Sequence, residues 1–129
     1  MSDTPALRGA PLLIERLEGL AILVLALVFY GWQGGNWWLF TLLILAPDIS
    51  MIGYAAGPRL GARVYNAAHT LVGPVLLGVA GLVVDAHPVI TLALIWAAHI
   101  GADRLFGYGL KYDAGFGFTH LGKIGRSTD

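Results

Sequence analysis

Apolar residues occur in four long runs, separated by short breaks rich in glycine, proline or polar residues. A helix needs roughly 20 largely apolar residues to cross the hydrocarbon core of a bilayer. The runs lack the period-2 alternation of transmembrane β-strands. Short connections make consecutive helices antiparallel neighbours. The pattern therefore predicts an all-α fold, an integral membrane four-helix up-down bundle, with spans at about 12–31, 37–56, 60–84 and 88–106.

These spans divide the chain into three parts. Residues 1–11 form a predicted cytoplasmic N-terminal segment, and residues 12–107 form the four-helix transmembrane domain. Residues 108–129 form a cytoplasmic tail rich in glycine and aromatic residues. The tail is too short and too polar for a fifth span, so we expect it to fold back over the mouth of the bundle as an interfacial segment.

The basic residues set the predicted orientation, because cytoplasmic loops of membrane proteins carry an excess of lysine and arginine. All eight fall on one side of the predicted bundle: Arg8, Arg16, Arg59, Arg63, Arg104, Lys111, Lys123 and Arg126. The opposite side carries Tyr30, Trp32, Trp37 and Trp38, which suit the headgroup layer. We therefore expect a bacterial inner-membrane protein with both termini in the cytoplasm.

Composition supports the lipid environment and excludes several kinds of chemistry. Apolar residues make up 57% of the chain and charged residues only 12%. A soluble protein of this size could not bury so much apolar surface. The absence of cysteine excludes disulfides, thiolate nucleophiles and sulfur-ligated metals. Without a basic block there is no expected nucleic-acid partner; the expected partner is the lipid bilayer.

Ionisable side chains inside the predicted spans carry the functional information. Each costs at least ~2.5–3.5 kcal/mol to insert, so such residues normally face the bundle interior and have a role. With the predicted topology, all of them fall in the cytoplasmic half of the membrane. They are contributed by four different helices: Glu15, Glu18, Asp48, His69, His99 and Asp103.

The spacing and chemistry of these residues suggest a metal site. His99 and Asp103 are four residues apart and share a helix face. Imidazole and carboxylate ligands without sulfur suit zinc, manganese or iron. Pro47 frees a backbone carbonyl beside Asp48 and can turn that carboxylate inward. We predict Asp48, His69, His99 and Asp103 as metal ligands and Glu18 as a catalytic base or outer ligand; the alternative is a purely structural hydrogen-bonded cluster.

Several linked motifs along the chain resemble a known family. They are Leu45 to Tyr54 (LAPDISMIGY), Tyr65 to Thr70 (YNAAHT), His99 to Arg104 (HIGADR) and Gly107 to Tyr112 (GYGLKY). Together they resemble the bacterial membrane family of domain of unknown function 4260, over about residues 16–122. The resemblance implies a membrane protein but no activity.

A more distant similarity is to the membrane-bound metal-dependent hydrolases. That group carries a Pro-Asp-x-Asp motif, a motif ending in His-Ser or His-Thr, and a later aspartate on a helix. Pro47-Asp48, His69-Thr70 and His99 with Asp103 are similar to these elements. Ser50 stands where the group has its second aspartate, and Asn66 or Tyr65 where it has a further histidine.

Two functions follow as expectations. The first is a metal-dependent hydrolase acting at the membrane interface, on a substrate such as a lipid or isoprenoid phosphate, with Arg63 or Lys111 binding the substrate. The alternative is a non-catalytic accessory or structural subunit of a larger membrane complex, whose glycines permit close helix packing. A proton relay is not expected, because the outer half of the predicted spans has no ionisable residue.

Overall fold

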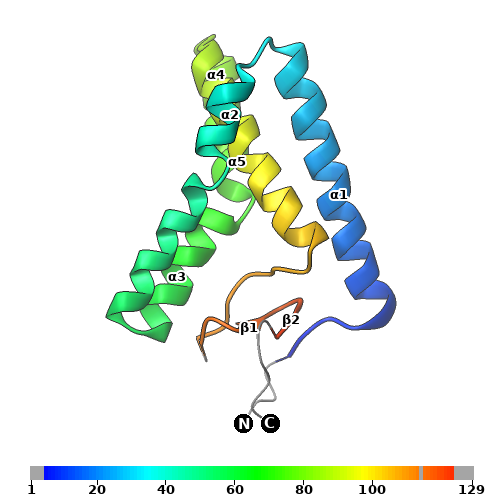
Figure 1. The fold of residues 1–129 in the computed structure, drawn as a ribbon, viewed down its shortest axis with the longest axis vertical. Coiled ribbons are helices and arrows are strands. Elements are labelled where there is room, and N and C mark those ends of the chain that lie inside the picture. The colour runs from blue at the N-terminus through cyan, green and yellow to red at the C-terminus, as the bar shows by residue number, and fades with distance from the viewer. Residues whose placement is uncertain (1–4, 114, 124–129) are drawn as a thin grey trace.

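The fold is mostly helical, as the hydrophobic pattern predicts. The computed structural model describes residues 5–113 and 115–123. Figure 1 shows the long helices α1 and α5 side by side, with a small hairpin near the start of α1. The elements are α1 (Gly9–Trp32), α2 (Trp37–Leu43), the 3-10 helix η1 (Ala46–Ala56), α3 (Pro58–His69), α4 (Val72–Val83), α5 (His87–Leu105), β1 (Phe118–Thr119) and β2 (Gly122–Lys123).

The first and fourth predicted helices agree closely with α1 and α5, but the second and third are each interrupted. Residues 37–56 form α2 followed by η1, and residues 60–84 form α3 and α4. The second break follows from Pro74, which has no backbone N–H and whose ring crowds the carbonyl four residues earlier. Thr70 accordingly adopts an extended conformation between α3 and α4. The third predicted span thus agrees with the apolar stretch Pro58–Val83, but it is divided at Thr70 into α3 and α4.

Three helix pairs build the core. α1 and α4 each pack along α5, while α3 packs along η1. Figure 1 shows α3 and η1 as an arm that diverges from α1. The arm carries Asp48 and His69. Helix α5 carries His99 and Asp103, so these four residues meet where the arm contacts α5.

Glycine sets the closeness of α1 and α5. A Cβ atom built on Gly19 would lie 2.6 Å from the Leu105 nitrogen, and one built on Gly101 would lie 2.7 Å from the Leu23 nitrogen. Such distances are too short for any real side chain, so the two backbones touch directly. Small residues at helix crossings permit this close approach.

The loop between α1 and α2 is fixed by an aromatic cluster. Tyr30 is fully buried, packs edge-on against Trp37 and Phe40, and donates a hydrogen bond to the Asn36 carbonyl. The Asn36 side chain in turn accepts from the backbone N–H of Trp38 and caps α2. Tyr30 is thus a core residue of the aromatic cluster that closes this end of the fold.

The C-terminal tail is more ordered than a loop. β1 and β2 form an antiparallel hairpin. Lys111 pairs with Thr119, and the Leu7 N–H donates to the His120 carbonyl 2.9 Å away. These contacts join the segment before α1, the tail and the hairpin into one layer. The described residues of the glycine-rich tail, 108–113 and 115–123, therefore form a folded cover at one end of the helices.

Two helical stretches are long and apolar enough to cross a bilayer by length and composition. They are Trp37–Ala56, with a mean hydropathy of 1.7, and Pro58–Val83, with a mean hydropathy of 1.5. α1 and α5 have 24 and 19 residues, but each carries charged side chains that lower its mean hydropathy. The structure therefore weakly suggests a membrane protein.

We expect Gly101→Val to destabilise the fold by about 1–3 kcal/mol, because the added methyl groups force α1 away from α5. The measurement is the thermal unfolding midpoint of the purified protein in detergent micelles. Gly78→Ala is the matched control: a Cβ there would lie 3.6 Å from the Ala93 Cβ, an ordinary contact. Its midpoint should stay equal or rise slightly. Equal midpoints for Gly101→Val and the parent protein would contradict the backbone contact.

Candidate metal centre

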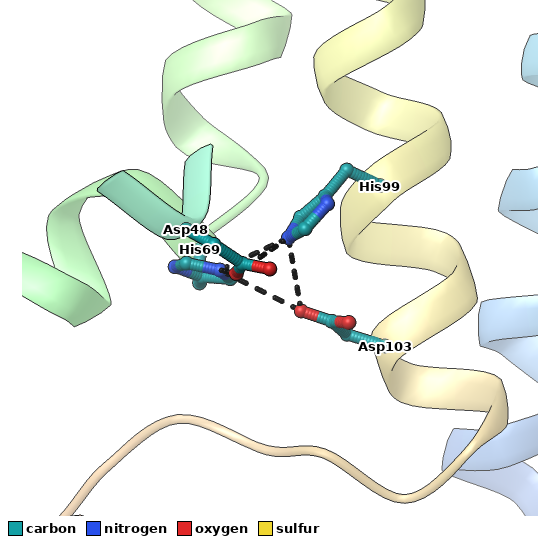
Figure 2. A group of neighbouring side chains, drawn as sticks. All are labelled: Asp48, His69, His99 and Asp103. Carbon is teal, nitrogen blue, oxygen red and sulfur yellow. Dashed lines mark hydrogen bonds and ion pairs between the residues drawn. The ribbon is translucent and has the colours of Figure 1, made fainter. Parts of the chain in front are cut away.

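Four side chains from three elements meet at one point. Asp48 comes from η1, His69 from the end of α3, and His99 and Asp103 from neighbouring turns of α5 (Figure 2). One ligand atom from each lies within 4.8 Å of all the others. Both imidazoles are 4% exposed, whereas the side chains of Asp48 and Asp103 are 30% and 18% exposed. The histidines therefore form the closed side of the cluster, and the carboxylates form the open side.

The two imidazole rings are oriented by backbone carbonyls. The Nδ1 atom of His69 lies 2.8 Å from the Tyr65 carbonyl oxygen, and the Nδ1 atom of His99 lies 2.6 Å from the Ile44 carbonyl oxygen. A carbonyl can only accept, so each Nδ1 carries the hydrogen. In the neutral rings, both Nε2 atoms then present a lone pair to the centre. An Nδ1–H···O=C bond of this kind is typical of metal-binding histidines.

The spacing of the donor atoms fits a single metal ion. The Nε2 atoms of His69 and His99 are 3.1 Å apart. Asp48 Oδ1 lies 3.0 and 3.1 Å from them, and Asp103 Oδ2 lies 3.5 and 3.2 Å from them. Metal–ligand bonds of ~2.0–2.1 Å place tetrahedral donors ~3.3–3.4 Å apart and neighbouring octahedral donors ~2.9 Å apart. These five distances, 3.0 to 3.5 Å, lie close to these values, and the ligand atoms of all four residues lie within 4.8 Å of one another.

Pro47 explains how Asp48 and His99 come together. Pro47 has no N–H, and the Asp48 N–H donates to the Leu45 carbonyl, the 3-10 pattern, instead of to Ile44. The Ile44 carbonyl is thereby released from the helix and accepts the hydrogen bond from His99. The carbonyl that Pro47 was predicted to free is that of Ile44, and it accepts a hydrogen bond from the imidazole of His99, a candidate metal ligand.

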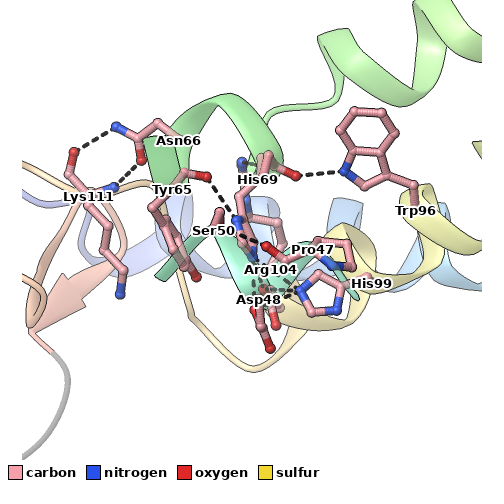
Figure 3. A network of polar contacts seen from close by, with 12 residues as sticks. Pro47, Asp48, Ser50, Tyr65, Asn66, His69, Trp96, His99, Arg104 and Lys111 are labelled. Carbon is pink, nitrogen blue, oxygen red and sulfur yellow. Dashed lines mark hydrogen bonds and ion pairs between the residues drawn. The ribbon is translucent and has the colours of Figure 1, made fainter. Parts of the chain in front are cut away.

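The end of α3 is held by side chains of α5. Helix ends leave carbonyls without partners. The Ala68 carbonyl accepts from Trp96 Nε1 at 2.6 Å, and the His69 carbonyl accepts from Arg104 Nη2 at 3.0 Å (Figure 3). Tyr65 stacks on His69 with ring centroids 3.7 Å apart. These contacts fix the position and tilt of the His69 imidazole.

A pocket of about 230 Å³ adjoins the open side of the cluster. Asp48 and Asp103 line it at one side, and Lys111 from the tail lines it at another. Asn66 positions this lysine by accepting from its N–H at 2.6 Å and donating to its carbonyl at 2.8 Å (Figure 3). Burial lowers the pKa of Lys111 from 10.5 to about 8, although Asp103 and Asp48 act in the opposite direction.

The other residues predicted from the sequence lie elsewhere. Glu18 and Arg63 are exposed on α1 and α3, and neither lines the pocket. The roles predicted for them, catalytic base and substrate binding, gain no support from this geometry. Ser50 donates to the Pro47 carbonyl at 2.7 Å and so stabilises η1 locally.

Sequence reasoning missed the positioning residues Tyr65, Trp96 and Arg104. Tyr65 lies four residues before His69, and Trp96 lies three before His99. This spacing places Tyr65 on the same helix face as His69, and Trp96 on the same face as His99. Whether such a residue contacts a free carbonyl or an imidazole ring depends on where the helices are interrupted. The sequence indicates these interruptions less clearly than it indicates the helix faces.

A family model for a domain of unknown function, DUF4260, matches residues 13–124. The chain belongs to the DUF4260 family. The matched range contains all four residues of the cluster, together with Lys111 and the whole described tail. No curated protein and no solved structure matches this DUF4260 chain.

We expect Lys111 to titrate near pH 8 in metal-free protein, below the ordinary lysine value of 10.5. The folded state holds the Lys111 proton less tightly than the unfolded state does. This group's contribution to stability therefore rises with pH between about 8 and 10.5. NMR of protein whose lysines carry ¹³C-methyl labels measures the titration of Lys111, whose signal is the one lost in Lys111→Met. A Lys111 titration at its ordinary value of 10.5 would contradict the burial of this residue.

Proposed function

We propose that Asp48, His69, His99 and Asp103 bind one divalent metal ion. The single observation that carries the proposal is the convergence of four acceptor atoms, with both histidine Nδ1 hydrogens already bonded to carbonyls. A cation at the centre satisfies all four atoms at once. The donor set of two imidazoles and two carboxylates suits zinc, manganese or iron.

We infer further that the chain is a multi-pass protein of the bacterial inner membrane. In a soluble protein, an apolar helix of this length is a core helix and is mostly buried. Here none of the Trp37–Ala56 window and only 17% of the Pro58–Val83 window is buried. The positions of the basic residues, together with Figure 1, support a cytoplasmic location for both ends of the chain, because α1 begins, α3 begins and α5 ends toward the same end of the fold.

The chemistry that fits this centre best is hydrolysis of a substrate at the membrane interface. A divalent ion lowers the pKa of a bound water and polarises a substrate oxygen. Catalytic metal sites keep a coordination position open, whereas structural sites are closed by protein ligands. The centre is closed by buried histidines on one side and adjoins the pocket through its carboxylates on the other. This asymmetry favours a catalytic site.

A second candidate is an accessory subunit of a larger membrane complex. A groove of about 420 Å³ between α1, α4 and α5 is lined almost wholly by apolar side chains, among them Phe29, Trp32 and Val79. A partner helix or lipid would suit such a groove. Native membranes distinguish the two functions: an accessory subunit migrates in a stable larger assembly after mild solubilisation, and an independent enzyme does not.

We expect the purified protein in detergent to hold one divalent ion per chain after loading with zinc, manganese or iron and desalting. His99→Gln and Asp48→Asn should each lose most of the bound metal, because each removes one of four ligands. Elemental analysis by mass spectrometry gives the stoichiometry. Circular dichroism shows whether each variant retains its helices.

His87→Gln is the matched control, since His87 lies on α5 at the end remote from His99 and contacts the Gln33 carbonyl. It should retain full metal content. Folded parent protein that stays metal-free after loading with each of the three ions would reject the metal centre.

The membrane orientation is testable because the chain has no cysteine. We expect Val84→Cys, between α4 and α5, to react with a membrane-impermeant maleimide in spheroplasts. Arg59→Cys, at the start of α3, should react only after the membrane is permeabilised. Labelling of Arg59→Cys in sealed spheroplasts would reverse the proposed orientation.

A further inference from the structure

The pocket beside the metal-ligand candidates has charged groups at two sides and aromatic walls between them. Asp48 and Asp103 lie at one side and Lys111 at another, while Tyr65, Phe116 and Tyr108 contribute rings. Its volume, about 230 Å³, is small and suits the head of a ligand better than a whole lipid. The described tail supplies three of these residues, so the pocket exists only when the tail is folded against the helices.

Lys111 is buried and forms no ion pair within the described part of the chain. The residue is only 4% exposed, and no carboxylate of residues 5–113 and 115–123 forms an ion pair with it. Its Nζ lies 3.8 Å from the Phe116 ring centroid and 4.8 Å from the Tyr65 ring centroid. Cation–π contacts stabilise an ammonium group only in part. Asp103 and Asp48 act on the ammonium only from a distance, and burying a charge without a directly bonded counter-charge is costly, so the arrangement calls for an anion beside Lys111.

The charges of the groups around the pocket indicate where an anion would bind. In the proposed metal-bound state, the divalent ion balances the carboxylates of Asp48 and Asp103. The ammonium of Lys111 then leaves the pocket with one net positive charge. A ligand that reaches both the metal and Lys111 must carry negative charge and oxygen atoms that point in more than one direction. A phosphate monoester meets both requirements, since its three terminal oxygens diverge tetrahedrally.

We propose that this pocket binds the phosphate head of a phosphate monoester, with Lys111 contacting one terminal oxygen and the metal centre another. The inference rests on the proposed metal centre and names its substrate class. Lysine binds phosphate as a point charge, and Asn66 fixes the backbone from which this lysine projects. The aromatic and methionine side chains of the pocket contact the organic part of the ester.

The corresponding reaction is hydrolysis of the ester. The oxygen of one water molecule forms a bond to phosphorus, and the bond between phosphorus and the alcohol oxygen breaks. The alcohol oxygen leaves with the bonding pair and takes up a proton from the attacking water. The products are the alcohol and inorganic phosphate, and no oxidant or reductant is needed.

The test compares Lys111→Met with Lys123→Met in zinc- or manganese-loaded protein. Both lysines contact an aromatic ring, but Lys123 lies on β2 and does not line the pocket. The ligands are inorganic phosphate, p-nitrophenyl phosphate, lysophosphatidic acid and, as a carboxylate match, oleate. Calorimetry measures binding, and release of inorganic phosphate measures hydrolysis.

We expect Lys111→Met to retain one metal ion per chain, to weaken phosphate ester binding at least tenfold, and to raise KM more than it lowers kcat. Lys111→Arg should restore part of the affinity, and Lys123→Met should leave it unchanged. Preference for lysophosphatidic acid over p-nitrophenyl phosphate assigns a lipid substrate, and equal affinity assigns a soluble one; both support the phosphate head.

Two results overturn the inference and separate it from the metal proposal. Metal-loaded parent protein that binds oleate as tightly as the phosphate esters, or that binds no phosphate ester, rejects the phosphate class while the metal centre stands. Unchanged binding in Lys111→Met rejects the role of the lysine. Phosphate ester binding by protein that takes up no metal would instead reject the metal centre.

Discussion

The orientation of two imidazole rings is the constraint on which the rest of this structure depends. Each ring donates its Nδ1 hydrogen to a backbone carbonyl, of Tyr65 for His69 and of Ile44 for His99. The Nε2 lone pairs are then 3.1 Å apart and face two carboxylate oxygens. Acceptor atoms repel one another strongly where little water is present. The rings keep this orientation at low cost only when a positive charge lies between them.

The interruptions of the helices supply the carbonyls that this orientation needs. In a regular helix every interior carbonyl accepts from the N–H four residues later, so none is available to a side chain. The break at Pro47 releases the Ile44 carbonyl, and the end of α3 releases those of Ala68 and His69. Irregular backbone at membrane depth is tolerated where protein covers it. The breaks lie inside the two long apolar stretches, and the carbonyls that they release make them part of the site.

The sequence was sufficient to predict the helical fold, the ends of α1 and α5, and the gathering of Asp48, His69, His99 and Asp103. Hydrophobic length and the depth of each polar residue carry that information. The interruption of the second helix at Pro47 was predicted, but the division of the third into α3 and α4 was not, because the conflict between proline geometry and an apolar run is resolved by tertiary contacts such as those of Trp96 and Arg104. The tail was also underestimated: its pairing with Leu7 and Asn66 joins segments far apart in sequence.

The proposed metal, the phosphate head and the fold of the tail are coupled through one charge. Lys111 reaches the pocket only while Asn66 holds its backbone, and its ammonium lies near the carboxylates that would bind the metal. A divalent ion bound by these carboxylates would repel the Lys111 ammonium. An anion bound between the ion and the ammonium would offset that repulsion. Binding free energies that share one interaction are reciprocal. An anion that binds beside Lys111 would therefore stabilise the folded tail by as much as the folded tail stabilises the bound anion.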